Sequence, residues 1–186
     1  LSFTATIKVQ SPSTGVVTKQ LLADIGDPGA TEVPGFGLRT IIEREQRIFP
    51  FAQYATFITN HDMNRVISQL RGSVDKARIA ASLLLTTPGV PFLYYGEEIG
   101  MSGMKPDPLI RAPFRWDETA TTAGFTSARR PWSELSDDPA GTSVAVETDD
   151  PLSLLSHYRN LIHLRTDHSA LSVGDVAIID VDGAQG

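Results

Sequence analysis

The chain has 186 residues, of which 41% are hydrophobic and 20% charged, and this balance excludes disorder along its whole length. A net charge of -6 with scattered Lys and Arg argues against a nucleic-acid partner, because phosphate binding needs concentrated basic side chains. The absence of cysteine excludes disulfides, thiolate zinc sites and cysteine nucleophiles, and no apolar run approaches the ~18 residues of a membrane span.

The first 50 residues are predicted to form a hairpin, a loop and a helix. Apolar and polar residues alternate over 1–10, which is typical of a strand, and a turn-forming stretch separates this strand from a hairpin partner over 16–25. Residues 26–37 hold four Gly and two Pro and are predicted to form a loop. Apolar residues on one face predict a helix over 38–49, which Pro50 ends.

The next segment has the pattern of a strand, a helix and a second strand. Short apolar, β-favouring runs predict strands over 54–59 and 90–95. Between them, Ser73 is expected to cap a helix over 74–87. The segment is roughly 40 residues long, the size of a βαβ unit, so we expect parallel strands that are buried on both faces.

A long connection follows over residues 96–148, which are rich in Pro, Gly, Thr and Asp. Loops of this length are usually functional or mobile. Asp150 is expected to cap a last helix whose first residue is Pro151, and residues 176–181 predict a further strand. Because the chain starts at Leu1 rather than Met and ends just after this strand, we expect both ends to be cut.

Polar clusters follow both strands of the predicted βαβ unit. Asn60, His61 and Asp62 come directly after the first strand, and Glu97 and Glu98 follow the second. Both clusters would face the same rim of the sheet, which is where ligands of α/β proteins bind. An ionised Asp62 there can stabilise positive charge that develops on a substrate, and His61 offers a donor for sugar hydroxyls.

Structural roles compete with these chemical ones. Asn and Asp readily form turns and caps, so the tripeptide alone favours Asp62 as a cap of the next segment and His61 as a surface residue. Arg65 has the chemistry to orient a carboxylate. Glu97 and Glu98 are neighbours that point apart, so we expect a rim hydrogen bond or a loop brace rather than an acid/base pair.

The long connection carries further candidates. Arg111 and Arg115 flank a Pro-Phe turn, and substrate contact or pinning of the loop are equally good interpretations. Phe114 and Trp116 have faces on which sugars stack, although loop aromatics more often cover a core edge. The sequence contains no metal-ligand spacing and no nucleotide-binding or serine-hydrolase motif.

Five segments, in order and at the right spacing, resemble glycoside hydrolase family 13. Residues 57–65 (FITNHDMNR) resemble the end of its barrel strand 7. Residues 80–89 (AASLLLTTPG) and 91–100 (PFLYYGEEIG) are similar to its helix 7 and strand 8. Residues 105–116 resemble the loop that follows in α-amylases and α-glucosidases, and residues 149–171 resemble helix 8.

The resemblance implies an α/β fold in which the chain forms part of a (β/α)8 TIM barrel, from about strand 6 or 7 to strand 8 and helix 8. Residues 54–172 would be the C-terminal part of the catalytic barrel, and 173–186 the truncated start of a C-terminal β-domain. Residues 1–53 match the family poorly and would fall at strand 6 and helix 6. That placement would make residues 1–10 helical, which stays open beside the strand prediction.

The resemblance also implies a function, that of a segment of a retaining hydrolase of α-glucosidic bonds. Asp62 would be the transition-state-stabilising carboxylate, and His61 and Arg111 would bind substrate. Asn60 and Arg65 would contact these residues rather than the substrate itself. Retention needs a nucleophile and a general acid, which follow strands 4 and 5 in the family. Neither motif occurs in this chain, so the chain alone is expected to be inactive.

Two competing hypotheses remain: a non-catalytic carbohydrate-binding or interaction module on the same fold, and an unrelated α/β binding domain. The expected partners are an α-glucan or maltooligosaccharide and the rest of the parent barrel. Self-association is a further expectation, because part of a barrel exposes unpaired strand edges. No cofactor or metal is expected here, since the calcium region of the family lies outside this chain, and neither nucleic acid nor membrane is an expected partner.

Overall fold

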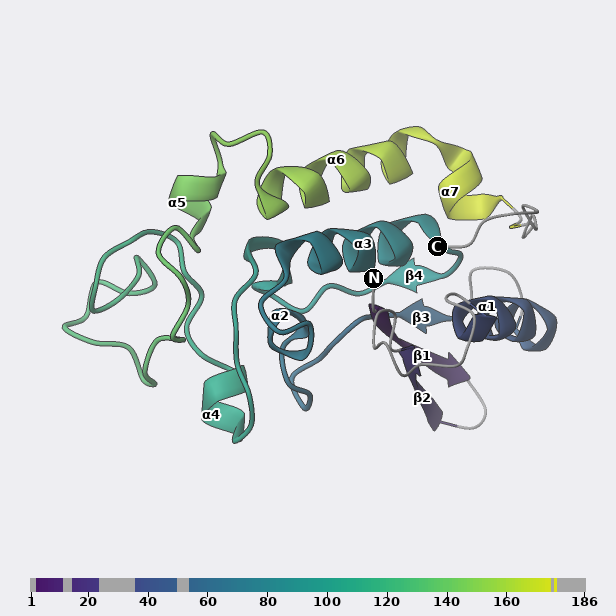
Figure 1. Cartoon of the computed structure of the whole chain (residues 1–186), viewed down its shortest axis with the longest axis horizontal. Coiled ribbons are helices and arrows are strands. Elements are labelled where there is room, and N and C mark those ends of the chain that lie inside the picture. Colours follow the sequence, from purple (N-terminus) through teal and green to yellow (C-terminus); the bar gives the residue numbers. More distant parts are fainter. Residues whose placement is uncertain (1–2, 12–14, 24–35, 50–53, 175, 177–186) are drawn as a thin grey trace.

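The computed structural model describes residues 3–11, 15–23, 36–49, 54–174 and 176, arranged as a hairpin, a strand–helix–strand unit and two C-terminal helices (Figure 1). No described helix has the length and apolar character needed to cross a membrane. The elements are β1 (Phe3–Ser11), β2 (Gly15–Ala23), α1 (Phe36–Ile48), β3 (Ala55–Thr56), α2 (Val66–Gln69), α3 (Val74–Thr86), β4 (Val90–Pro91), the 3-10 turn η1 (Glu97–Ile99), α4 (Asp107–Ile110), α5 (Val144–Glu147), α6 (Leu154–Asp167) and α7 (Ser169–Val173).

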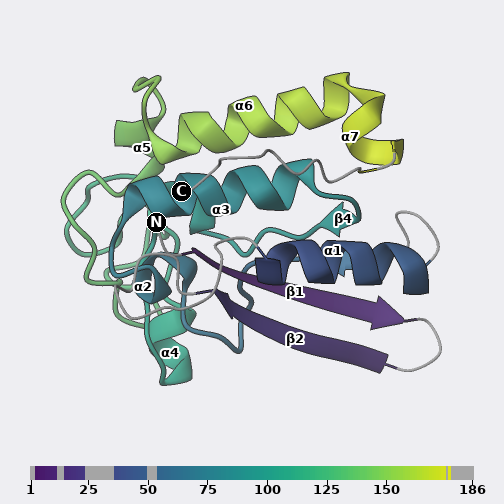
Figure 2. The ribbon, with the colours of Figure 1, turned by 45° about the vertical axis from the view of Figure 1, so that its right-hand side comes forward.

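The predicted hairpin near the N-terminus is confirmed. Strands β1 and β2 pair antiparallel, with a register that runs from Phe3 opposite Ala23 to Ser11 opposite Gly15 (Figure 2). The alternative of a helix over residues 1–10 is therefore wrong. Helix α1 begins two residues before the predicted start, and most of the loop predicted over 26–37 lies outside the described residues.

Strands β3 and β4 are parallel neighbours, as predicted. Val90 N–H donates to the Tyr54 carbonyl at 2.8 Å, and Phe92 N–H donates to the Thr56 carbonyl at 2.7 Å. Each strand is shorter than the apolar run that predicted it. In the described part of the chain these two strands form a sheet of their own, so each is bonded along one edge only.

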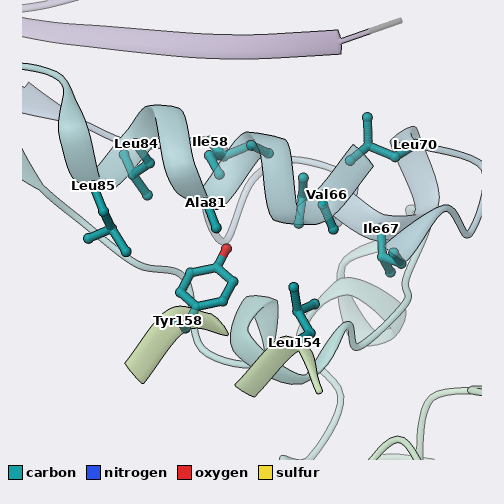
Figure 3. Packing of buried hydrophobic residues seen from close by; sticks show 11 residues of the cluster. Ile58, Val66, Ile67, Leu70, Ala81, Leu84, Leu85, Leu154 and Tyr158 are labelled. Carbon is teal, nitrogen blue, oxygen red and sulfur yellow. The ribbon is translucent and has the colours of Figure 1, made fainter. Parts of the chain in front are cut away.

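Helix α3 connects β3 to β4 along the chain and packs along α6 (Figures 1 and 2). Ser73 caps it as predicted, since its hydroxyl accepts from Lys76 N–H at 3.4 Å. The buried residues of α3 include the small residues Ala77, Ala80 and Ala81, which belong to the same core cluster as Leu154 and Tyr158 of α6. The core around this contact contains Ile58, Val66, Ile67, Leu70, Ala77, Ala80, Ala81, Leu84, Leu85, Leu154 and Tyr158 (Figure 3).

The start of the last long helix differs from the prediction. Ser153 caps α6, accepting from Ser156 N–H at 3.0 Å, and the helix begins at Leu154 rather than Pro151. Asp150 instead accepts from Leu152 N–H at 2.8 Å, so its side chain stabilises a turn before the helix. Of the strand predicted over 176–181, only residue 176 belongs to the described residues. Most of the β-domain expected over 173–186 also lies outside them.

Arg165 connects α6 to the C-terminal end of α3. Its buried guanidinium donates to the carbonyls of Leu85 at 2.8 Å, Thr87 at 3.1 Å and Gly89 at 2.7 Å. The last carbonyls of a helix have no partners within the helix, and a cation is favourable there. This side chain therefore holds the turn that leads from α3 into β4.

We expect Arg165→Ala to lower the free energy of unfolding by on the order of 3 kcal/mol, because three carbonyls lose a charged donor. Urea unfolding followed by circular dichroism measures this loss. Arg159→Ala is the matched control, since Arg159 is exposed on the same helix and exposed charges contribute little. Equal losses for both variants would contradict the role of Arg165 as a helix cap.

Candidate active site

Residues Asn60, His61 and Asp62 form an exposed turn beyond the carboxyl end of β3. The Asn60 side-chain oxygen accepts from Asp62 N–H at 2.9 Å, and its carbonyl accepts from Met63 N–H at 3.1 Å. Asn60 therefore shapes the turn. Helix α2 has Arg65 at its N-cap position with no side-chain cap, so the interpretation of Asp62 as a helix cap is wrong.

The Asp62 carboxylate lies between two basic side chains. His61 Nε2 is 3.3 Å from Asp62 Oδ2, and Arg111 Nη2 is 3.0 Å from Asp62 Oδ1. Arg111 Nε also donates to the His61 carbonyl at 3.0 Å. The long connection thus returns to the turn, and the structure brings together three residues that the sequence singled out. Asp62 keeps 61% of its side chain exposed, so a ligand can reach it.

Two residues that sequence reasoning missed complete this cluster. Asp107 Oδ2 is 2.8 Å from Arg111 Nη2, and Asp107 Oδ1 is 3.2 Å from Lys105 Nζ. The hydrogen bond from Lys105 lowers the pKa of Asp107, and nearby Arg111 adds to this effect. The spacing of four residues between Asp107 and Arg111 is the signal that could have found the pair, because such residues meet on one helix face.

Arg65 lies behind the turn and is fully buried. Its Nη1 donates to the Tyr95 carbonyl at 2.6 Å, and its guanidinium carbon lies 4.8 and 4.6 Å from the ring centres of Tyr94 and Tyr95. The contact with the Asp62 carboxylate comes from Arg111 instead. Gly96 leaves room for this packing, since a Cβ there would lie 2.9 Å from Arg65 Nη1 at a φ of +87°.

Glu97 and Glu98 point apart, as predicted. Glu97 Oε1 accepts from Thr59 N–H at 3.2 Å and from the Thr59 hydroxyl, whereas Glu98 Oε2 accepts from Gly96 N–H at 2.7 Å. Glu97 is only 1% exposed, and this burial raises the pKa of its carboxyl to about 8. Glu97 is therefore a brace between the two strand ends, the role that the sequence favoured.

A small cavity of about 280 Å³ lies beside the turn, lined by Ala55, Phe57, Thr59, Asn60, Phe92, Leu93 and Tyr94. A larger cavity of about 640 Å³ is lined from α2, α3, α5 and the start of α6, and none of the predicted site residues lines it. Since Asp62 and His61 are exposed rather than enclosed, the site in this chain is an open rim at the strand ends.

The remaining candidates have structural contacts. Arg115 Nε donates to the Thr142 carbonyl at 2.9 Å, so this arginine pins the long connection. Phe114 and Trp116 pack edge to face at 4.8 Å between ring centres, with Trp116 52% exposed. Within the ranges that the structure covers, no three His, Asp or Glu side chains gather in a way that could hold a metal ion.

In α/β barrel enzymes, each helix connects two parallel strands, and the polar side chains of the active site follow the carboxyl ends of those strands. The residues described above have this arrangement. The family model for the alpha amylase catalytic domain matches residues 30–174. The chain therefore belongs to the α-amylase family of glycoside hydrolases, family 13. This match excludes the hypothesis of an unrelated α/β binding domain.

Relatives cover most of this chain but are much longer. Alpha-amylase 3 of Dictyoglomus thermophilum is 40% identical over 147 residues, which are 75% of this chain and 28% of that protein. The 4-alpha-glucanotransferase of Thermotoga maritima is 36% identical over 125 residues, 64% of this chain and 28% of the relative. The crystal structure of the alpha-amylase from H. orenii aligns with a TM-score of 0.60 at 40% identity, over 77% of this chain and 29% of that one.

The raised pKa of Glu97 makes stability depend on pH. Between the ordinary value of 4.5 and about 8, the folded chain binds more protons than the unfolded chain. The free energy of unfolding therefore falls as pH rises through this window, by up to about 1.4 kcal/mol per pH unit. We expect Glu97→Gln to flatten this decline and to be more stable than the wild type at pH 8.

Urea unfolding at half-unit steps from pH 4.5 to 8.5 measures how the free energies of unfolding of the wild type and Glu97→Gln change with pH. Glu134→Gln is the control, because Glu134 is exposed in the long connection. Parallel curves for the wild type and Glu97→Gln would show that the Glu97 carboxyl ionises as freely in the folded chain as in the unfolded one.

Proposed function

We propose that this chain is the C-terminal part of the catalytic barrel of a retaining α-glucan hydrolase. The observation that carries the proposal is the Asp62 carboxylate, exposed at the strand ends with His61 on one oxygen and Arg111 on the other. A carboxylate that is fixed in place before the reaction stabilises positive charge more effectively than mobile solvent does. Cleavage of a glycosidic bond develops such charge on the sugar ring.

Each residue of the site has a distinct role in this proposal. Asp62 stabilises the oxocarbenium-like transition state. His61 donates a hydrogen bond to sugar hydroxyls, and Arg111 holds the Asp62 carboxylate and binds substrate beside it. Asn60 sets the conformation of the turn, and Arg65 anchors the turn from behind through the Tyr95 carbonyl.

The chain spans roughly 30% of the length of the relatives, and the family's nucleophile and general-acid motifs do not occur in its sequence. In this proposal those two carboxyl groups come from a preceding part of the barrel, so residues 1–186 alone do not hydrolyse α-glucans. Relatives are named as alpha-amylase, oligo-1,6-glucosidase and 4-alpha-glucanotransferase, which supports an α-glucan as the substrate class.

The test is a chimera of this chain with Alpha-amylase 3 of D. thermophilum. The part of this chain that aligns with Alpha-amylase 3 over 147 residues replaces the corresponding segment of that enzyme. We expect the chimera to hydrolyse maltooligosaccharides, whereas the 186-residue chain alone shows no turnover. Asp62→Asn in the chimera is expected to lower kcat by at least about 100-fold, because the neutral amide no longer stabilises positive charge. Reducing-sugar release measures both.

Asp167→Asn is the matched control for Asp62→Asn, since Asp167 is exposed at the end of α6, away from the strand ends. An active chimera that tolerates Asp62→Asn would overturn the role of Asp62. A chimera that binds maltooligosaccharides but hydrolyses none would instead favour the alternative, a non-catalytic carbohydrate-binding or interaction module.

We also propose that the open edge of β4 is where the rest of the barrel docks, and that copies of the chain associate there when that part is absent. Val90 of β4 and the two residues that follow the strand, Phe92 and Leu93, are 50%, 57% and 41% exposed, which is unusual for large apolar side chains so close together. In the described residues no strand pairs with the outer edge of β4. Unpaired apolar edges of this kind promote association.

Sedimentation of the 186-residue chain tests this second proposal. We expect concentration-dependent association, and we expect Phe92→Ser to weaken it at least several-fold because the apolar edge loses its most exposed ring. Trp132→Ser is the control, since Trp132 is 69% exposed in the long connection. A monomeric wild type, or equal weakening by both variants, would speak against the β4 edge as the docking surface.

A further inference from the structure

A buried hydrogen-bonded pair joins the carboxyl ends of the two parallel strands. Thr59 follows β3, Glu97 begins the turn after β4, and the two residues are 2% and 1% exposed. One carboxyl oxygen of Glu97 accepts from both the N–H and the hydroxyl of Thr59. Asp62 lies three residues beyond Thr59, so this contact is the nearest buried anchor on the β3 side of the site.

This carboxyl group lies in a place that is unfavourable for it. Its second oxygen, Oε2, has no hydrogen-bond partner among the described residues. Glu98, of like charge, adds to the raised pKa of this carboxyl, and Tyr158 of α6 lies near it, with a pKa that is raised first by burial and then by Glu97. A buried carboxyl without a cation weakens folding when it ionises. Packing alone therefore does not account for a glutamate here.

The turn that carries Asp62 has few other fixed points. His61 and Asp62 are 66% and 61% exposed, and their contacts with each other and with Arg111 lie at the surface. The far side of the turn is held at Arg65, whose N–H donates to the Gly103 carbonyl and whose side chain reaches the Tyr95 carbonyl. On the near side, the hydrogen bonds of Thr59 to Glu97 link the chain before the turn to the segment after β4.

We propose that Glu97 is a positioning residue for Asp62: by holding Thr59 against the turn after β4, it sets the height of the Asn60–Asp62 turn above the strand ends. The catalytic consequence rests on the function proposed above, whereas the positioning of the turn does not. Geometry of this kind matters because a carboxylate displaced by about 1 Å from the reacting centre loses much of its effect on rate.

The first test is nuclear magnetic resonance of the complete 186-residue chain. We expect the amide signals of Thr59, His61 and Asp62 to shift together with a common midpoint near pH 8, where the buried Glu97 carboxyl ionises. Glu97→Gln should keep the wild-type signal positions at low pH and lose this step. Glu97→Ala should displace all three signals at every pH. Thr59→Val, which replaces the hydroxyl with a methyl group, should displace them in the same direction, and it provides the test if Glu97→Ala fails to fold.

The control is Glu147→Gln, because the Glu147 carboxyl accepts from Leu155 N–H between α5 and α6 and is separate from the strand ends. It should retain the step near pH 8. Signals of His61 and Asp62 that stay at their wild-type positions in both Glu97→Ala and Thr59→Val would overturn the proposal. The Thr59–Glu97 hydrogen bonds would then fix Thr59 alone and have no effect on the position of the turn.

The second test uses the chimera with Alpha-amylase 3. We expect Glu97→Ala to lower kcat roughly 10- to 100-fold with KM within about twofold, and Glu97→Gln to restore most of kcat. Equal losses in Glu97→Gln and Glu97→Ala would contradict positioning through the Thr59 hydrogen bonds. If the unmodified chimera is inactive, the proposed function fails, and the resonance measurements on the chain still decide the role of Glu97.

Discussion

The parallel pairing of β3 with β4 is the constraint on which the site depends. Because α3 returns the chain to the same end of the sheet, the residues after both strands meet at one rim. Helix α3 packs along α6 as it makes this crossing, and Arg165 fixes the point at which the chain turns into β4. The position of the Asn60–Asp62 turn follows from that pairing.

Three buried ionisable side chains compensate for the shortness of these strands. A two-residue ladder leaves nearby backbone groups without strand partners, and buried backbone groups need hydrogen bonds. Arg65 supplies a donor to the Tyr95 carbonyl, Glu97 an acceptor for Thr59 N–H, and Arg165 a donor to the Gly89 carbonyl. Ionisable groups that are costly to bury thus occur where the backbone lacks partners.

The exposed parts of the chain divide into a polar rim and an apolar edge. At the rim, Asp62 and Asp107 share the cation of Arg111, and Lys105 supplies a second positive charge beside Asp107, while these groups remain open to a ligand. Directly after β4, Phe92 and Leu93 are exposed, as expected for one part of a larger α-amylase-family barrel. In our proposal the rim binds an α-glucan, whereas the apolar edge packs against the rest of the barrel.

The sequence by itself determined the hairpin, the βαβ unit with its Ser73 cap, the family and the cluster after β3, because these follow from local periodicity, capping chemistry and ordered motifs. Local signals misplaced the start of α6, where Asp150 forms a turn and Ser153 caps the helix. Only the tertiary structure decided that Arg111 rather than Arg65 reaches Asp62, and that Glu97 is buried against Thr59. These contacts join residues far apart in the chain: Arg111 reaches Asp62 because the long connection folds back over the strand ends, and Glu97 reaches Thr59 because β3 and β4 are paired.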